Sequence, residues 1–270
     1  KLSYSNNNLN FNFFTKKELD ICAFDELYSL ASNKNLYLII NCAAYTNVEH
    51  AEKDYTIANE VNNIAISNLI NICNEKKIKL IHISTDYIFD GIKNDLYNEN
   101  DTPNPINVYG LTKYEGEKKI IESELQNSLI IRTSWLYSIS SQNNFVMKIL
   151  KKLKQKKSFE VNNIEQGTPT NASDLARDII KIITEINFKK PTILNYTNSG
   201  FCSRLEFAQK IKKIMDSETQ IIGSENSFSK VKRPKFSGLN NSKFMSVFDI
   251  EINNWDFSLA KSLNTLKDGF

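Results

Sequence analysis

Glycine is scarce in this sequence: there are 8 glycines in 270 residues, and the first is Gly91. A glycine-rich turn after an opening strand is what lets a backbone approach a pyrophosphate at a helix N-terminus. Nothing in the first 90 residues fits such a turn. A phosphate loop of this kind is therefore excluded from the stretch where a dinucleotide-binding fold would carry it.

Cysteine and histidine are also few. The four cysteines lie far apart with no Cys-x-x-Cys pair, which argues against zinc and against a disulfide framework. Such cysteine usage favours a reducing, cytoplasmic location. His50 and His82 have no partner at ligand spacing, so we expect no metal site.

Long apolar runs and an excess of one charge are absent too. The longest apolar runs are about six residues, so we expect no membrane-spanning helix and no signal peptide. The 34 basic and 31 acidic residues give a formal charge of +3, which is too balanced to predict a nucleic-acid partner. The dense basic run at 148–157 carries an apolar stripe and is interpreted as a solvated helix face.

Short apolar runs alternate with longer amphipathic segments along the chain. The runs that predict strands are 9–14, 36–42, 79–84, 128–134, 158–161 and 192–197. The segments that predict helices are 22–32, 54–76, 109–126, 143–157, 173–187 and 203–215. This alternation predicts an α/β fold with a doubly wound, mostly parallel, Rossmann-type sheet. The runs 36–42 and 79–84 are apolar enough to be interior strands.

The alternating pattern ends at about residue 200, where a polar stretch and short helical segments follow. We therefore expect a dinucleotide-binding domain over 1–200 and a smaller C-terminal substrate lobe over 201–270. Part of 138–157 is expected to belong to the lobe.

Three predicted strands end in small polar residues: "NCAAYTNVE" after residue 40, "STDYIFDG" after 83 and "TSWLY" after 132. Ligands bind beyond the carboxyl ends of strands in open parallel sheets. The three strand ends therefore predict one shared site.

Tyr109 and Lys113 are candidate catalytic residues beside that site. They lie four residues apart, so a helix places them on one face. A phenol has a pKa of about 10, and a nearby ammonium favours its ionised form. Thr85 could polarise the same carbonyl oxygen to which Tyr109 would give a proton, while a nicotinamide supplied hydride.

The spacing alone is weak evidence, because Tyr-x-x-x-Lys occurs a second time at Tyr114 and Lys118. At about 100° per residue, Tyr114 points roughly 140° away from Tyr109 around the same helix. Tyr109 is preferred because it stands at a helix start directly downstream of the "STDY" strand end.

An ordered set of motifs carries a family resemblance: "NCAAYTNVEHAE", "ISTDYIFDG", "PNPINVYGLTKYEGE", "IIRTSWLY" and "QGTPT". In this order they resemble the dTDP-4-dehydrorhamnose reductases, which are extended short-chain dehydrogenases. The resemblance runs from about residue 18 to 175. It implies NADPH-dependent reduction of the C4 ketone of a nucleotide-linked deoxyhexulose, most simply dTDP-4-dehydro-L-rhamnose to dTDP-L-rhamnose, for cell-surface polysaccharide synthesis.

The resemblance also implies roles for single residues. Tyr109 would be the proton donor, Lys113 would hold the nicotinamide ribose, and Thr85 would bind the reacting oxygen. Asp86, Trp135 and Arg233 match substrate-side positions, although Trp135 could also be plain core. The positions that match cofactor-lining or supporting residues are Asp20, Ile21, Ala43, Ala44, Tyr45 and Asn62.

Several positions depart from the family pattern. Ile164 and Glu165 precede "QGTPT", where the family usually has Asp-Gln. Arg204 and Leu205 stand where aromatic residues are common, and "KRP" at 232–234 is followed by Ser-Gly-Leu rather than Ser-Arg-Leu. Loss of an arginine weakens phosphate recognition. A reductase of a UDP-linked amino sugar, and a non-catalytic regulatory subunit on the same fold, therefore stay as alternatives. A homodimer is compatible with the resemblance.

Lys16 and Lys17 bear on the choice between NADPH and NADH. They follow the predicted strand 9–14, where an acidic residue would bind the ribose of NAD. Two ammonium groups could instead meet a 2′-phosphate, so NADPH is expected and NADH is the alternative. The bland interpretation is a pair of surface lysines.

The start of the chain carries one further expectation. Residues 1–21 are interpreted as the end of a first helix followed by a second strand, so about twenty residues would precede Lys1. In the strand order 3-2-1-4-5-6 the missing strand is central. We expect an open slot between strands 9–14 and 79–84, or direct pairing of the two, unless residues 1–8 fill the position.

Overall fold

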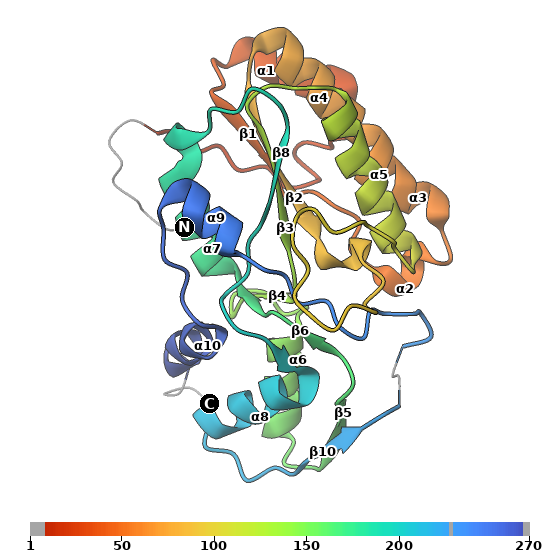
Figure 1. Ribbon diagram of the computed structural model, residues 1–270, viewed down its shortest axis with the longest axis vertical. Helices are drawn as coiled ribbons and strands as arrows, with labels where there is room; N and C mark the ends of the chain where they lie inside the picture. The colour runs from red at the N-terminus through yellow and green to blue at the C-terminus, as the bar shows by residue number, and fades with distance from the viewer. Residues whose placement is uncertain (1–8, 227–228, 267–270) are drawn as a thin grey trace.

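A parallel sheet covered by helices on both faces forms the upper part of the molecule in a computed structural model (Figure 1). The model describes residues 9–226 and 229–266. The strands of this sheet, in the order β1-β2-β3-β8, are Leu38–Asn41, Lys79–Thr85, Ser128–Thr133 and Thr192–Asn195. All three pairings are parallel, so the predicted doubly wound α/β class is confirmed.

The strands differ in burial according to their place in the sheet. All six residues of β3 are buried, whereas β1 is mostly half-buried. The expectation that 36–42 is an interior strand is therefore wrong for the described residues, in which β1 pairs with β2 alone. In the register, Thr85 lies opposite Thr133, which brings polar strand ends to one edge.

The segment 9–14 forms no strand, contrary to expectation. Neither the open slot nor direct pairing with 79–84 is found, because β1 and β3 occupy the two sides of β2. Phe13 is 77% exposed, and residues 10–14 all lie on the surface without a pairing partner. Residues 1–8, the alternative source of a strand, lie outside the described residues.

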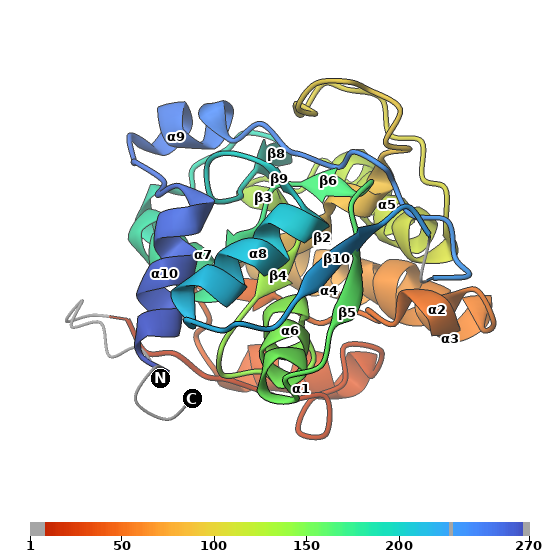
Figure 2. The ribbon, with the colours of Figure 1, turned by 90° about the horizontal axis from the view of Figure 1, so that it is seen from below.

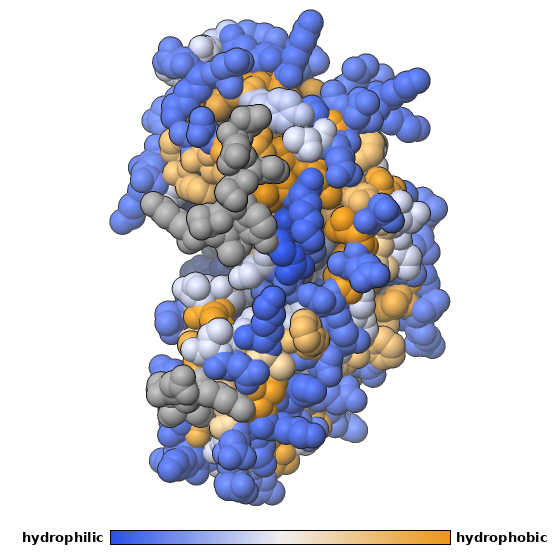
Figure 3. Space-filling model, turned by 90° about the vertical axis from the view of Figure 1, so that its left-hand side faces the viewer, coloured by the Kyte–Doolittle hydropathy of each residue, from blue (hydrophilic) through white to orange (hydrophobic). Residues whose placement is uncertain are grey.

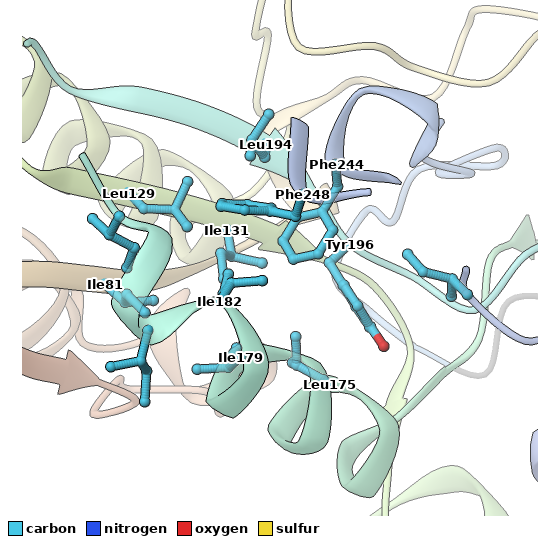
Figure 4. Packing of buried hydrophobic residues seen from close by; sticks show 13 residues of the cluster. Ile81, Leu129, Ile131, Leu175, Ile179, Ile182, Leu194, Tyr196, Phe244 and Phe248 are labelled. Atoms are coloured by element: carbon cyan, nitrogen blue, oxygen red, sulfur yellow. The ribbon is translucent and has the colours of Figure 1, made fainter. Parts of the chain in front are cut away.

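Helices cover both faces of the sheet. One face is covered by α1 (Phe24–Asn33), α4 (Ala65–Lys76) and α5 (Val108–Glu122), which share an apolar cluster with β2 and β3. The other face packs against α7 (Ala172–Ile182) and α9 (Ser242–Phe248). Figure 4 shows Phe244 and Phe248 of α9 packed over the side chains of β3 and β8.

A third apolar cluster lies below the sheet around Phe207, which is fully buried and contacts four other aromatic rings. It joins α6 (Phe145–Lys154), α8 (Arg204–Ile214) and α10 (Trp255–Asn264), which lie together in Figure 2.

Two strands flank this cluster. The predicted strand 158–161 is found as β5 (Phe159–Asn162), but it pairs with β10 (Ile221–Ser224) outside the main sheet. The division at residue 200 stays a prediction; α6 and β5 lie with the lower cluster, and α9 packs on the sheet.

The remaining elements are short. They are α2 (Val48–Ala51), α3 (Tyr55–Asn59), the π-helical η1 (Glu60–Ile64), the 3₁₀ turns η2 (Asp86–Ile88) and η3 (Ile183–Glu185), and the strand pairs β4 (Leu136–Tyr137) with β7 (Thr170–Asn171) and β6 (Gln166–Gly167) with β9 (Cys202–Ser203).

Asparagine, which is abundant in the sequence, starts many of the helices. The side chains that accept a backbone N–H at a helix N-terminus include Asn47, Asn107, Asn144, Asn171 and Asn254. An N-cap of this type contributes about 1 kcal/mol to stability. A part of the asparagine content therefore serves helix initiation.

Figure 3 shows hydrophilic residues over most of one face, with apolar side chains in smaller areas between them. Among residues 9–226 and 229–266, no helix combines the length and apolar character needed to cross a membrane.

Candidate active site

Thr85 and Tyr109 meet at the carboxyl end of β2. Thr85 is the last residue of the strand; its hydroxyl donates to Asp86 Oδ1 at 3.0 Å and accepts the Tyr87 N–H at 3.2 Å. Burial raises the pKa of the half-buried Tyr109, and a hydrogen bond with Thr85 acts in the opposite direction. The Tyr87 ring supports Tyr109 edge-on at 5.7 Å.

Lys113 lies one turn further along α5 and is only 1% exposed. Its Nζ donates to the Ile83 carbonyl at 2.7 Å and lies 3.1 Å from His82 Nε2. Burial lowers the pKa of Lys113 to about 8. The amine is thus fixed behind the strand end that carries Thr85, with a charge that is easily lost.

The second Tyr-x-x-x-Lys pair is in a different environment. Lys118 forms an ion pair with Glu115 at 2.9 Å and lies over the Tyr114 ring, 5.4 Å from its centroid. Tyr114 packs beside Ile88 and Phe89 rather than at the strand end. The helix therefore separates the two pairs as its geometry predicts.

Two glycines allow α5 to approach its neighbours closely. A Cβ on Gly110 would lie 2.1 Å from the Tyr87 carbonyl oxygen, and one on Gly116 would lie 2.2 Å from that of Asn62. Backbone atoms cannot yield as a flexible side chain can, so glycine is required at both positions. These contacts hold Tyr109 and Lys113 at the sheet edge.

Asn62 supports the loop beyond β1. Its amide accepts the Tyr45 N–H at 2.8 Å, donates to the Tyr45 carbonyl at 3.1 Å and donates to Thr112 Oγ1 at 3.1 Å. It belongs to η1, a π-helical turn of the kind that often accompanies functional sites. Asn62 thereby ties the loop to α5 and leaves Ala43 exposed at the strand end.

Two of the N-terminal candidates take part in hydrogen bonds. Asp20 accepts the Cys22 N–H at 3.0 Å, and the Ile21 carbonyl accepts from Asn68 at 3.0 Å. Both residues lie on the segment leading into α1, whereas Lys16 and Lys17 are exposed. The Lys16 side chain is 73% exposed and forms an ion pair with Asp20 at 3.6 Å.

Asp86 is buried, and one of its carboxylate oxygens, Oδ2, has no hydrogen-bond partner among the described residues. Burial raises the pKa of this carboxyl to about 6. An unpaired buried oxygen is costly unless something else pairs with it. Asp86 is thus equipped to accept a hydrogen bond from a ligand hydroxyl.

Trp135 follows β3 with a positive φ of 45°, an uncommon conformation for a bulky residue. Its half-buried ring carries the Arg204 guanidinium, whose central carbon lies 3.5 Å from the ring centroid. Arg204 also forms an ion pair with Glu165 at 3.5 Å. Glu165 and Arg204, two of the departures from the family pattern, therefore contact each other.

Arg233 lines a cavity of about 1100 Å³ between the segments around residues 90–96, 162–166 and 229–236. Its guanidinium lies 3.3 Å from Glu49 of α2. Phe236, Lys232 and Glu165 also line this cavity. Thr85, Tyr109 and Lys113 do not line it, so this cavity is not the reacting centre.

Sequence reasoning missed two residues and one contact here. It considered His82 only as a candidate metal ligand and did not single out Asn41, which lies beside it. It treated Glu165 and Arg204 as two separate departures, not as a pair. The available signal was the place of Asn41 and His82 on neighbouring strands, where they pair in register.

Comparisons with known proteins agree with this geometry. A family model described as RmlD substrate binding domain matches residues 2–268. A dTDP-4-dehydrorhamnose reductase from Aggregatibacter actinomycetemcomitans is 32% identical over 253 residues, which are 90% of this chain and 85% of that protein.

Solved structures agree as well. The dTDP-4-dehydrorhamnose reductase from Bacillus anthracis in complex with NADP has a TM-score of 0.87 and 32% identity, covering 93% of this chain and 89% of that one. The Clostridium acetobutylicum reductase has a TM-score of 0.89 and 31% identity, covering 97% and 92%. This chain therefore belongs to the RmlD family, that of the dTDP-4-dehydrorhamnose reductases.

Proposed function

We propose that this protein is an NADPH-dependent oxidoreductase that reduces the C4 ketone of dTDP-4-dehydro-L-rhamnose to dTDP-L-rhamnose. The observation that carries the proposal is the placing of a buried lysine, a tyrosine and a threonine at one strand end. Membership of the family supports it, as does the NADP in the complex of the similar Bacillus anthracis reductase.

The cofactor-side residues fit a nicotinamide dinucleotide. Ala43 is exposed beyond β1, and Ala44 and Tyr45 continue the same loop, so short side chains leave room at the strand end. In the proposal, Asp20, Ile21, Ala43, Ala44 and Tyr45 line the cofactor, and Lys16 and Lys17 meet its 2′-phosphate. The bound nicotinamide supplies the hydride.

The chain's own residues handle the proton. Tyr109 gives its phenolic hydrogen to the ketone oxygen, which becomes a hydroxyl, and Thr85 holds that oxygen by a hydrogen bond. Lys113 lies one turn from Tyr109 on the same helix, and its ammonium form favours the ionised form of the phenol. Asp86 and Trp135 hold the sugar, and Arg233 meets the diphosphate, because a guanidinium pairs well with phosphate oxygens.

Tyr109→Phe tests the proposal, because it deletes only the proton donor. We expect turnover to fall by about 10²–10⁴-fold. Binding of NADPH, measured by fluorescence titration, should hardly change. Tyr114→Phe, on the same helix, should leave turnover within a few-fold, and a larger loss from Tyr114→Phe would contradict the assignment.

The substrate is tested separately. The experiment compares the reduction of 4-keto nucleotide sugars that carry either dTDP or UDP. We expect the dTDP-linked deoxyhexulose to be reduced most efficiently. Equal or better reduction of a UDP-linked amino sugar would redirect the proposal. A homodimer and a cytoplasmic location belong to the proposal and are checked by light scattering and by fractionation.

A further inference from the structure

Behind Lys113, three buried polar side chains form a line through the sheet. Asn41 is 4% exposed, His82 is fully buried and Lys113 is 1% exposed. Asn41 Nδ2 lies 3.0 Å from His82 Nδ1, and His82 Nε2 lies 3.1 Å from Lys113 Nζ. The three residues come from β1, β2 and α5.

The backbone fixes the direction of these hydrogen bonds. The Ala43 N–H donates to Asn41 Oδ1 at 3.1 Å, so the amide NH₂ of Asn41 faces His82 and donates to Nδ1. A neutral imidazole carries one hydrogen, which must then be on Nε2. That hydrogen points at Lys113 Nζ, which accepts it only as an uncharged amine and donates to the Ile83 carbonyl.

A charged Lys113 disrupts this line. An ammonium has three donors and no acceptor, so it needs Nε2 as its acceptor and moves the imidazole hydrogen to Nδ1. Nδ1–H would then face the NH₂ of Asn41, and turning the amide around would place that NH₂ against the Ala43 N–H. An unpaired buried donor costs about 1–3 kcal/mol.

We propose that His82, oriented by Asn41, is a positioning residue that stabilises the uncharged amine of Lys113 by donating its Nε2–H. The inference deepens the proposed function, on which its catalytic meaning rests, since the charge of Lys113 decides how strongly it favours ionised Tyr109. The direction of the hydrogen bonds does not depend on the proposed function.

Burial is the main electrostatic influence on both residues. It holds the pKa of His82 well below its usual value, so the imidazole is neutral, and it also lowers the pKa of Lys113. Glu117, one turn further along α5, and Cys42 beyond β1 act in the opposite direction and raise the pKa of Lys113, but burial outweighs them. Glu117 is engaged by Arg132 through three contacts of 2.8–3.2 Å.

Nitrogen-15 NMR of the full chain without cofactor reads the tautomer directly. The sequence has 2 histidines, and His50→Gln identifies the second signal. At about pH 9.5, above the Lys113 pKa of about 8, we expect a neutral His82 with its hydrogen on Nε2. A hydrogen on Nδ1 at that pH would overturn the proposal.

Asn41→Asp is the matched reversal, with nearly the same shape. A carboxylate accepts from Nδ1–H, so Nε2 becomes an acceptor for charged Lys113. We expect the Nδ1–H tautomer and a lysine that keeps its charge to a pH about one unit higher, followed by the carbon-13 shift of Lys113 Cε. Retention of the wild-type tautomer in Asn41→Asp would count against the proposal. Neither measurement depends on turnover, so a failure of the Tyr109→Phe test would not contradict the proposed role of His82.

Discussion

Two arginine–glutamate pairs of this protein lie in opposite environments. Arg132 and Glu117 join β3 to α5 with side chains 2% and 0% exposed, and Arg132 also lies over the Phe89 ring. Arg233 and Glu49 join the cavity rim to α2 with side chains 30% and 43% exposed. The buried pair fixes the helix that carries Tyr109, whereas water can replace either partner of the rim pair. The same residue types therefore stabilise the structure in one region and leave a cation available to a ligand in the other.

Breaking the buried pair should have the largest effect on stability. Glu117→Gln leaves the Arg132 charge uncompensated inside the protein, and we expect the free energy of unfolding to fall by about 3–5 kcal/mol. Urea denaturation measures it. A loss below about 1 kcal/mol would mean that water or another group reaches Arg132.

Lys113→Met extends the comparison from stability to activity. It removes the amine beside Tyr109, and we expect turnover to fall by about 10²–10⁴-fold, measured as NADPH oxidation with substrate. The control is Lys118→Met on the same helix, which loses a partly exposed ion pair and a contact with the Tyr114 ring and should leave turnover nearly unchanged. Equal losses from both substitutions would refute the distinction between the two pairs.

Asp86 should make stability depend on pH. Its folded pKa of about 6 lies above the ordinary 3.8, so the folded state binds more protons between these values. Its contribution is therefore complete below pH 3.8 and is lost as the pH rises through 6. Relative to Asp86→Asn, the wild type should lose on the order of 2–3 kcal/mol over this window, followed by urea denaturation at several pH values. Parallel pH profiles would exclude the carboxyl as the cause.

Gly116→Ala tests the close approach of α5 to the Asn62 backbone, next to the buried Arg132–Glu117 pair. Alanine normally favours a helix, but here its Cβ meets the Asn62 carbonyl oxygen. We expect a loss of about 1–3 kcal/mol in the free energy of unfolding. Gly223→Ala is the control, since its nearest contact is the flexible Leu205 side chain. If Gly116→Ala were as stable as the wild type, α5 would not be held by this contact.

The smallest effect is expected at the rim. Glu49→Gln breaks an exposed pair, and such pairs often contribute nothing measurable, so the urea midpoint should stay close to that of the wild type. The KM for the nucleotide sugar should change more than the midpoint does, because Arg233 loses a competing anion. A clear fall in the midpoint with an unchanged KM would reverse the roles of the two pairs.

Much of the fold and of the strand-end geometry could be predicted, because both depend on local pattern. Apolar runs located β2, β3 and β8, and helix geometry separated Tyr109 from Tyr114. The prediction that 36–42 is an interior strand was wrong, since strand order depends on pairing between distant segments.

The contacts that sequence reasoning missed are non-local too. The line from Asn41 through His82 to Lys113 needs three separate elements to meet. Glu165 and Arg204 can be recognised as an ion pair only once the pairing of β6 with β9 brings them together.

The packing of α9 has a consequence for how the chain folds during synthesis. Phe244 and Phe248 complete the apolar cluster over β3 and β8, although more than two hundred residues of the chain precede them. A nascent chain therefore leaves the part of this face that α7 does not cover exposed until residues 244–248 have left the ribosome. Exposed apolar surface on such intermediates promotes aggregation. Chaperone demand and yield should thus respond more to substitutions in α9 than to equally buried ones in α1.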